Sequence, residues 1–188
     1  MSPDIIIRNA GIGDIADINR LLIHLAESLG EPDAYQGDTD ALLRHGFGPD
    51  PIYRAQVAQV ACKPELKSPD TDVGSNSYLA GLCLYFAEFS TWRCRPGIYI
   101  QDLIVESNWR GMGIGRGLLE YAHEDAVKHW DVNYLRLAVH RQNHDAQAFY
   151  AALGFTADTD NQIMMLDSAA FKQEAFRASQ TIHVSKIK

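Results

Sequence analysis

Four glycines alternate along residues 111–117, where a strand-like segment meets a helix-like one. The preceding residues 98–105 are apolar and rich in β-branched side chains, as in a strand. The apolar residues that follow are spaced as on one face of a helix: Leu118, Leu119, Ala122 and Ala126. Glycine weakens the start of a helix. Four of them there therefore indicate a backbone that needs positive φ or lies against a ligand.

The helix that begins here offers unpaired N–H groups and a positive dipole end, which together favour an anion such as a pyrophosphate. Two familiar phosphate-binding patterns do not fit. No Gly-Lys-Ser/Thr follows, and Arg116 and Leu118 stand where the dinucleotide pattern requires glycine. The pattern Arg110-x-x-Gly113-x-Gly115 instead resembles the acyl-CoA signature of the Gcn5-related N-acetyltransferases. The alternative is a glycine-rich turn without any ligand.

A second segment resembles the same family. Asn143 is followed by Ala146, Phe149-Tyr150 and Gly154-Phe155, as in the family's N-x-x-A-x-x-F-Y-x-x-x-G-F pattern. The resemblance implies that Asn143 caps a helix and bonds the pantetheine arm of CoA. It also implies that Tyr150 presents its phenol to the CoA sulfur and acts as general acid. The alternative for Tyr150 is an aromatic side chain packed in the core.

The resemblance runs from about Ile5 to Phe155 and is closest to the diamine (spermidine/spermine) acetyltransferase branch. The segments that carry it are His45-Gly46-Phe47-Gly48, Pro51-Ile52-Tyr53, Tyr85-Phe86, Thr91-Trp92 and residues 98–105. It implies an acetyl-CoA-dependent N-acetyltransferase that needs no metal, forms a homodimer and acts on a small primary amine. The residues that it implies along the pantetheine and pyrophosphate are Leu103, Ile104, Val105, Arg110, Gly111, Met112, Gly113, Ile114, Gly115 and Arg116. Trp92, Gln101 and Asp102 are implied to line the acceptor site.

Two departures remove a carboxylate from the branch pattern. Gln101-Asp102 replaces the usual Glu-Asp, and Ser28-Leu29 replaces Tyr-Glu in the first helix. Asp102 is then the candidate base. Neighbours on a regular strand point to opposite faces, so a bulge would decide which face Asp102 meets. There are two alternatives to Asp102 as the base: the acceptor is less basic and needs none, or a water oriented by Gln101 relays the proton.

The overall pattern predicts an α/β (α+β) fold, a mixed sheet with helices on both faces. The resemblance adds that the sheet is twisted and mostly antiparallel. We expect one acetyltransferase domain over residues 1–170 and a C-terminal helix or tail over 171–188. The predicted strands are 5–7, 53–61, 78–89, 98–105, 134–139 and 163–166. The predicted helices begin near Ile15, Asp38, Leu118, Asn143 and residue 168, and residues 62–77 are predicted to form an exposed hairpin loop.

Charge and composition narrow the function. The formal net charge of −7 argues against nucleic-acid binding. No apolar run approaches the roughly 18 residues of a membrane span, and no secretory signal opens the chain. Three cysteines without a CxxC pattern indicate a reducing, cytoplasmic setting and no zinc site. Residues 21–43 hold five carboxylates and no Lys or Arg, which suits either a cationic acceptor or a solvated loop. Protein or aminoglycoside acceptors, and a CoA-binding regulatory module without turnover, remain alternative functions.

Overall fold

The computed structural model describes residues 4–61 and 77–164. Within them lies a five-stranded sheet in the order β1-β2-β3-β4-β5. The first four strands pair antiparallel in succession and β5 pairs with β4 in parallel, which confirms the mixed, mostly antiparallel sheet. The strands are β1 (Ile5–Asn9), β2 (Arg54–Ala61), β3 (Ser77–Ser90), β4 (Arg95–Val105) and β5 (Leu135–Leu137).

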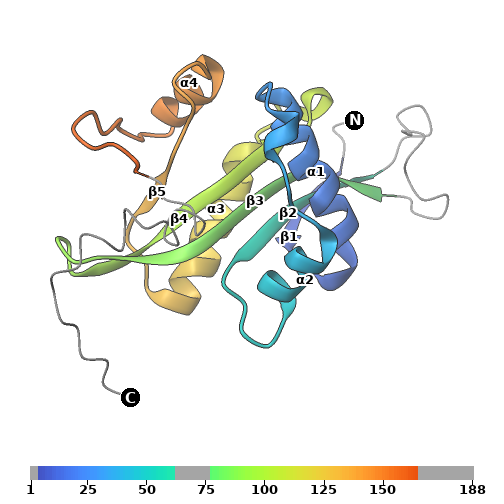
Figure 1. Ribbon diagram of the computed structural model, residues 1–188, viewed down its shortest axis with the longest axis horizontal. Helices are drawn as coiled ribbons and strands as arrows, with labels where there is room; N and C mark the ends of the chain where they lie inside the picture. Colours follow the sequence, from blue (N-terminus) through green and yellow to red (C-terminus); the bar gives the residue numbers. More distant parts are fainter. Residues whose placement is uncertain (1–3, 62–76, 165–188) are drawn as a thin grey trace, which may run out of the picture. The chain divides into compact units, whose positions relative to one another are not determined.

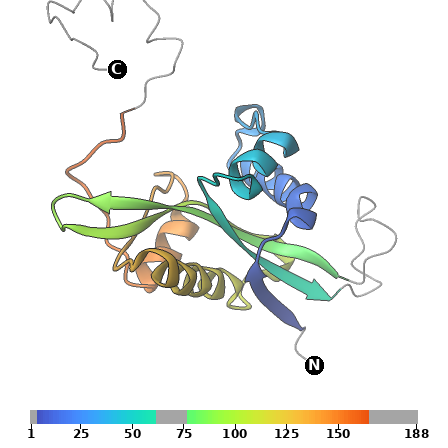
Figure 2. The same cartoon turned by 90° about the horizontal axis from the view of Figure 1, so that it is seen from below.

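Helices cover both faces of this sheet, as predicted. Helices α1 and α2 lie over one face and α3 over the other (Figures 1 and 2). The α-helices are α1 (Ile15–Ser28), α2 (Thr39–Phe47), α3 (Ile114–Trp130) and α4 (His144–Ala152). Short 3₁₀ turns are η1 (Ile12–Asp14), η2 (Pro32–Ala34) and η4 (Ser107–Trp109). The chain divides into two compact units, Met1–Phe149 and Tyr150–Lys188.

The core under α1 follows from the predicted helical spacing. Ile18, Leu21 and Leu22 are buried and pack on strand residues that include Leu82 and Ile104. The helix ends at Ser28, and Gly30 then takes a positive φ of 76° that an L-residue rarely adopts. The chain therefore turns away from the sheet toward η2 and α2.

The motif that links α2 to β2 is a packing unit. A Cβ on Gly46 would overlap the Tyr53 ring, so only glycine lets the helix lie this close. The Tyr53 hydroxyl donates to the Leu42 carbonyl at 2.6 Å, and Phe47 meets the Tyr53 ring edge-on. Burial raises the pKa of Tyr53 to about 12, so the phenol stays neutral.

Under α3 the sheet buries a polar network. The Arg54 guanidinium donates to both carboxylate oxygens of Asp125, at 2.5 and 2.8 Å. The Tyr85 hydroxyl donates to the same carboxylate at 2.6 Å. Burial opposes ionisation of Asp125, but these hydrogen bonds outweigh it and hold its pKa below the usual value. The network thereby fixes α3 to β2 and β3.

Some predicted element bounds differ from the structure. Strand β4 begins at Arg95 rather than residue 98, and β5 covers only Leu135–Leu137 instead of 134–139. Ile163 and Met164 are not in a strand. The rest of that predicted strand, the helix predicted over 168–178 and nearly all of the 62–77 loop lie outside the described residues.

We predict that Asp125→Ala lowers the free energy of unfolding by about 2–4 kcal/mol, because it leaves a half-buried Arg54 and a buried phenol without their acceptor. Urea unfolding measures the difference. Because folding lowers the pKa of Asp125, the network stabilises the protein at pH values above the usual carboxyl pKa. This stabilisation is lost as the pH falls through the lowered pKa. Glu120→Gln, which breaks an exposed ion pair with Arg116 on the same helix, should leave the melting temperature unchanged. Equal effects of the two substitutions would refute the structural role of the network.

Candidate active site

A bulge interrupts β4 at Gln101. Leu84 of β3 pairs with Asp102, whereas the next residue, Tyr85, pairs with Ile100. Gln101 is therefore the extra residue of a β-bulge. Its side chain is exposed.

The bulge decides which face Asp102 meets. Ile100 lies opposite Tyr85, whose hydroxyl reaches Asp125 on α3, so this pair faces α3. On a regular strand Asp102 would share that face, because side chains two apart point the same way. Beyond the bulge, however, Ile104 packs in the cluster under α1. Asp102 precedes Ile104 by two residues and therefore faces α1, so the bulge reverses the face that Asp102 meets.

The Asp102 carboxylate is half-buried and uncompensated. Among the described residues it has no hydrogen bond and no ion-pair partner. Burial raises the pKa of Asp102 to about 6. Its charge in turn contributes, after burial, to the raised pKa of Tyr35 and of Cys83. A carboxylate with this pKa is ionised at neutral pH and can take up a proton or hold a cation.

The bulge also marks where β4 and β5 part. Their pairing covers three positions, from Ile98–Leu135 to Ile100–Leu137. Past the bulge, β4 continues to Val105 and leads to η4, whereas β5 leads to α4 (Figure 1). In the described part of the chain no β5 residue pairs with Leu103, Ile104 or Val105. The outer edge of this half-strand can therefore hydrogen-bond an extended ligand.

The glycine-rich turn forms an open helix start. Gly111 and Gly113 have φ of 77° and 80°, and no atom lies within 4 Å of where their Cβ atoms would stand. Gly113 is the N-cap of α3 and supplies no side-chain cap. The first helical N–H groups, at Ile114, Gly115 and Arg116, have no partner within the helix by geometry. This arrangement suits an anion.

The other two glycines, Gly115 and Gly117, lie in the first turn of α3 itself, because the helix begins at Ile114 rather than near Leu118 as predicted, and both are closely packed. A Cβ on Gly115 would stand 3.2 Å from the Phe149 ring of α4. A Cβ on Gly117 would meet the Ile7 side chain of β1 at 2.5 Å. The alternation seen in the sequence therefore combines an open helix start at Gly111 and Gly113 with close packing at Gly115 and Gly117.

The flanking arginines are both exposed. Arg110 donates from Nε to the Val105 carbonyl at 3.0 Å, which folds its side chain back onto the end of β4. Arg116 pairs with Glu120 at 2.7 Å, one helical turn along. Met112 between them is half-exposed. Each side chain lies at the rim of the open helix start.

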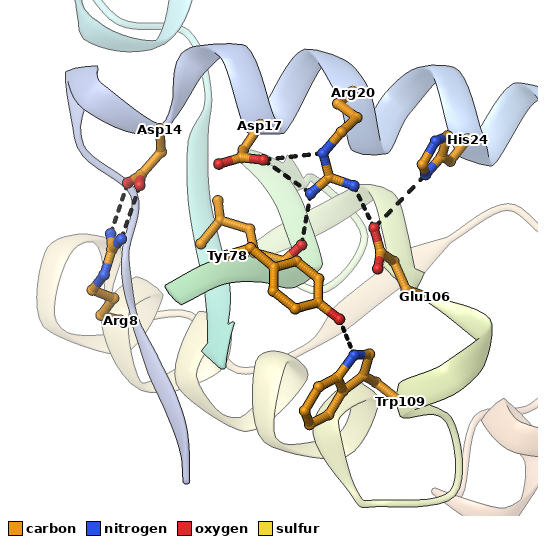
Figure 3. Close-up of polar contacts among 9 residues, drawn as sticks. Arg8, Asp14, Asp17, Arg20, His24, Tyr78, Glu106 and Trp109 are labelled. Atoms are coloured by element: carbon orange, nitrogen blue, oxygen red, sulfur yellow. Dashed lines mark hydrogen bonds and ion pairs between the residues drawn. The ribbon is translucent and has the colours of Figure 1, made fainter. Parts of the chain in front are cut away.

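A polar network that sequence reasoning missed holds η4 in place (Figure 3). Arg20 of α1 pairs with Glu106 and donates to the Leu79 carbonyl at 2.8 Å. The buried Trp109 donates from its indole to the Tyr78 hydroxyl. Both ends of the turn between β4 and the glycines are thus anchored to α1 and β3. The signal in the sequence is Glu106, a carboxylate directly after an apolar strand. Its role can be recognised only once the fold brings Arg20 to it.

The predicted residues of α4 are placed locally. The Asn143 side chain accepts from the Ala146 N–H at 3.1 Å, which confirms the predicted helix cap. Tyr150 lies near the end of α4, in the second compact unit, and its ring meets Phe155 edge-on. Gly154 follows with a φ of 92°, as predicted for a helix C-terminus. The role of Tyr150 in proton transfer stays a prediction.

Trp92 stands apart from the other acceptor-site candidates. It occupies the turn between β3 and β4 and is 98% exposed. Six residues of extended strand, about 20 Å, separate Arg95 from Gln101. The structure of one chain therefore does not bring Trp92 to Gln101 and Asp102, and its role also stays a prediction.

Residues 4–61 and 77–164 contain no cluster of three His, Cys, Asp or Glu side chains that could hold a metal ion. Within the same ranges no helix has the length and apolar composition needed to cross a bilayer.

Comparison with known proteins agrees with this architecture. Residues 70–155 match the acetyltransferase (GNAT) family model. The chain is 35% identical over 150 residues to thialysine N-epsilon-acetyltransferase from Bos taurus, covering 80% of this chain and 83% of that protein. It is 29% identical over 121 residues to spermidine/spermine N(1)-acetyltransferase-like protein 1 from Homo sapiens, covering 64% of this chain and 16% of that protein.

Solved structures show the same fold at low identity. An integron cassette protein from the mobile metagenome of V. cholerae superimposes with a TM-score of 0.65 at 18% identity, covering 93% of this chain and 98% of the other. This neighbour shows the fold. The bovine relative and the family match establish that the chain belongs to the acetyltransferase (GNAT) family, is an N-acetyltransferase, and resembles the diamine acetyltransferase branch.

Proposed function

We propose that this protein transfers an acetyl group from acetyl-CoA to a primary amine of a small molecule, by direct attack within a ternary complex. The observation that carries the proposal is the bulge at Gln101. It turns the uncompensated Asp102 carboxylate toward α1 at the same point where β4 parts from β5. One irregularity thus sets a proton acceptor beside a strand edge that can hold an extended thioester.

Acetyl-CoA is proposed to bind along β4 and the start of α3. The pantetheine arm would follow Leu103, Ile104 and Val105, and Asn143 would bond to it. The pyrophosphate would meet the N–H groups that follow Gly113, with Arg110 and Arg116 at the rim. The open space beside Gly111 and Gly113 supports this placement.

We predict that Gly113→Ala weakens CoA binding about tenfold or more, because a Cβ at a φ of 80° costs roughly 1–2 kcal/mol and narrows the approach to the helix N–H groups. Isothermal titration with CoA measures the affinity. Gly30→Ala is the matched control: it carries a similar φ of 76° with open space around it, at the far end of α1. Equal losses of affinity in both variants would contradict a specific role for the turn.

The chemistry requires removal of a proton. An alkylammonium with a pKa of about 10.4 costs roughly 4.6 kcal/mol to present as free amine at pH 7. Asp102 would take that proton as the nitrogen bonds to the acetyl carbon, with Gln101 orienting the amine or a water between them. The carbon–sulfur bond then breaks, and Tyr150 would donate its proton to the departing thiolate. A backbone N–H near Leu103 or Ile104 would stabilise the oxyanion.

We predict that Asp102→Asn lowers kcat/KM for the amine by about 10²–10⁴-fold. The wild-type pH profile should show a downturn below about pH 6 that the variant lacks. Because the folded-state pKa is raised, ionisation destabilises the native state as pH rises through the interval from the usual carboxyl pKa to about 6. The variant should therefore melt at a higher temperature than wild type at pH 8 and lose this advantage near pH 4. An unchanged pH profile would remove Asp102 as the base.

We predict that Tyr150→Phe lowers kcat by about 10–10³-fold through loss of the general acid. Affinity for acetyl-CoA should change little, since the ring is retained. Steady-state kinetics with saturating amine measures the effect. Should kcat stay at the wild-type value, Tyr150 has no part in proton transfer.

The acceptor class is proposed from the relatives and from charge. Relatives named for thialysine and for spermidine/spermine both point to amines. The five carboxylates of residues 21–43, which lie between the end of α1 and the first turn of α2, would attract a cation: Glu27, Glu31, Asp33, Asp38 and Asp40. No nucleic-acid or membrane partner is part of the proposal. The proposal also includes a homodimer and a cytoplasmic location, as the resemblance to the branch implies.

Thiol release from acetyl-CoA against spermidine, spermine, putrescine, thialysine, lysine and aminoglycosides tests the function. Turnover of one amine would establish transfer and name its acceptor class. Tight CoA binding without turnover of any amine would overturn the proposal in favour of a binding module, the alternative that the replacement of glutamate by Gln101 keeps open.

A further inference from the structure

The phenol of Tyr35 is held in a fixed position on the face of the sheet that Asp102 meets. Tyr35 follows η2 and packs against the cluster under α1 that contains Ile104. Its hydroxyl donates to the Asn19 side-chain carbonyl of α1 at 2.7 Å. Ile104 and Asp102 are two residues apart on the same face of β4. Tyr35 therefore belongs to the acceptor side of the proposed site, although no motif singled it out.

Gly37 fixes the same phenol from another side. A Cβ on Gly37 would lie within 3 Å of the hydroxyl oxygen and two carbons of the Tyr35 ring. Only glycine leaves room for the ring there. Asn19 and Gly37 thus restrict the hydroxyl independently, one through a hydrogen bond and one through close packing.

Two carboxylates act on this phenol. Burial is the main cause of the raised pKa of Tyr35, and the charges of Asp102 and Asp38 add to it. The Asp38 side chain caps α2 by accepting from the Ala41 N–H at 2.6 Å, which holds it at the start of that helix. The phenol therefore keeps its proton, and two carboxylates lie close enough for their charges to act on it.

The hydrogen-bonding capacity that remains is that of an acceptor. A phenol has one proton, and here that proton is committed to Asn19. The lone pairs of the Tyr35 oxygen and the carboxylates of Asp102 and Asp38 offer acceptors, and the amide nitrogen of Asn19 beside them is an uncharged donor. Such a set favours an ammonium group and disfavours a carboxylate, because residues 21–43 hold no Lys or Arg and Arg20, next to Asn19, is already paired with Asp17 and Glu106.

We propose that Tyr35 is a specificity-determining residue whose hydroxyl oxygen accepts a hydrogen bond from an ammonium group of the acceptor, so that diamines are preferred over amino acids. The proposal rests on the proposed acetyl transfer and narrows its acceptor. The carboxylate of an amino acid would face Asp102 and Asp38 without a counter-charge.

The test compares wild type, Tyr35→Phe and Gly37→Ala with putrescine and with lysine as acceptors. Tyr35→Phe should raise KM for putrescine about tenfold or more, as expected for loss of a hydrogen bond to a charged group. It should leave kcat within about twofold and KM for acetyl-CoA unchanged. The preference for putrescine over lysine should shrink. Gly37→Ala should raise the same KM, because it displaces the hydroxyl without removing it.

Tyr121→Phe, at an exposed position of α3, is the matched control and should match wild type in every parameter. Thermal melting shows that each variant is folded. Unchanged KM for putrescine in Tyr35→Phe, or an equal rise of KM for acetyl-CoA, would overturn the role of Tyr35.

A binding measurement separates this proposal from the proposed function. Putrescine is titrated into the CoA-loaded protein by calorimetry. Binding to wild type that weakens about tenfold in Tyr35→Phe supports the inference even if no amine is acetylated. Equal affinity in both proteins, or no binding to wild type, refutes it whatever the turnover.

Discussion

One extra residue in β4 decides which face of the sheet the later side chains of that strand meet. By adding Gln101 opposite the Leu84–Tyr85 step, the chain keeps Ile98 and Ile100 directed at α3 while turning Asp102 and Ile104 toward α1. On a regular strand these four side chains would all point to one face of the sheet, and the core on the other face would lose its β4 residues. The bulge at Gln101 directly follows the last residue pair between β4 and β5, Ile100–Leu137. The bulge therefore serves packing on both faces and opens the strand edge at one place.

The carboxylates that stabilise the fold differ from Asp102 in having an arginine partner. Those that hold the fold together are matched by arginine: Asp14 with Arg8, Glu106 with Arg20, and Asp125 with Arg54. Asp102 is half-buried but has no such partner among the described residues, and burial raises its pKa. An uncompensated charge of this kind costs stability. Its position beside an open strand edge gives a reason for the cost, since a bound ammonium would supply the missing charge.

Much of the fold could be predicted from local patterns in the sequence. The helical spacing from Ile15, the cap at Asn143 and the glycine turn before α3 were predictable, because each depends on neighbours within a few residues. The position of the bulge could not be predicted, because the register of β4 depends on β3, which lies elsewhere in the sequence. The anchoring of Glu106 by Arg20 and the fixing of Tyr35 by Asn19 were missed for the same reason. The family resemblance groups Trp92 with Gln101, whereas strand geometry separates them within one chain.

The central claim is that the bulge divides β4 into a half that pairs with β5 and a half that receives the ligand. An amide-resolved NMR titration with CoA tests it directly. The account predicts that the amides of residues 102–105 and of residues 113–116 shift together at the same CoA concentration. The amide of Ile98, which donates to the Tyr134 carbonyl, and that of Ile100 should stay in place. Shifts of equal size on both sides of Gln101, or none beyond it, would contradict the account.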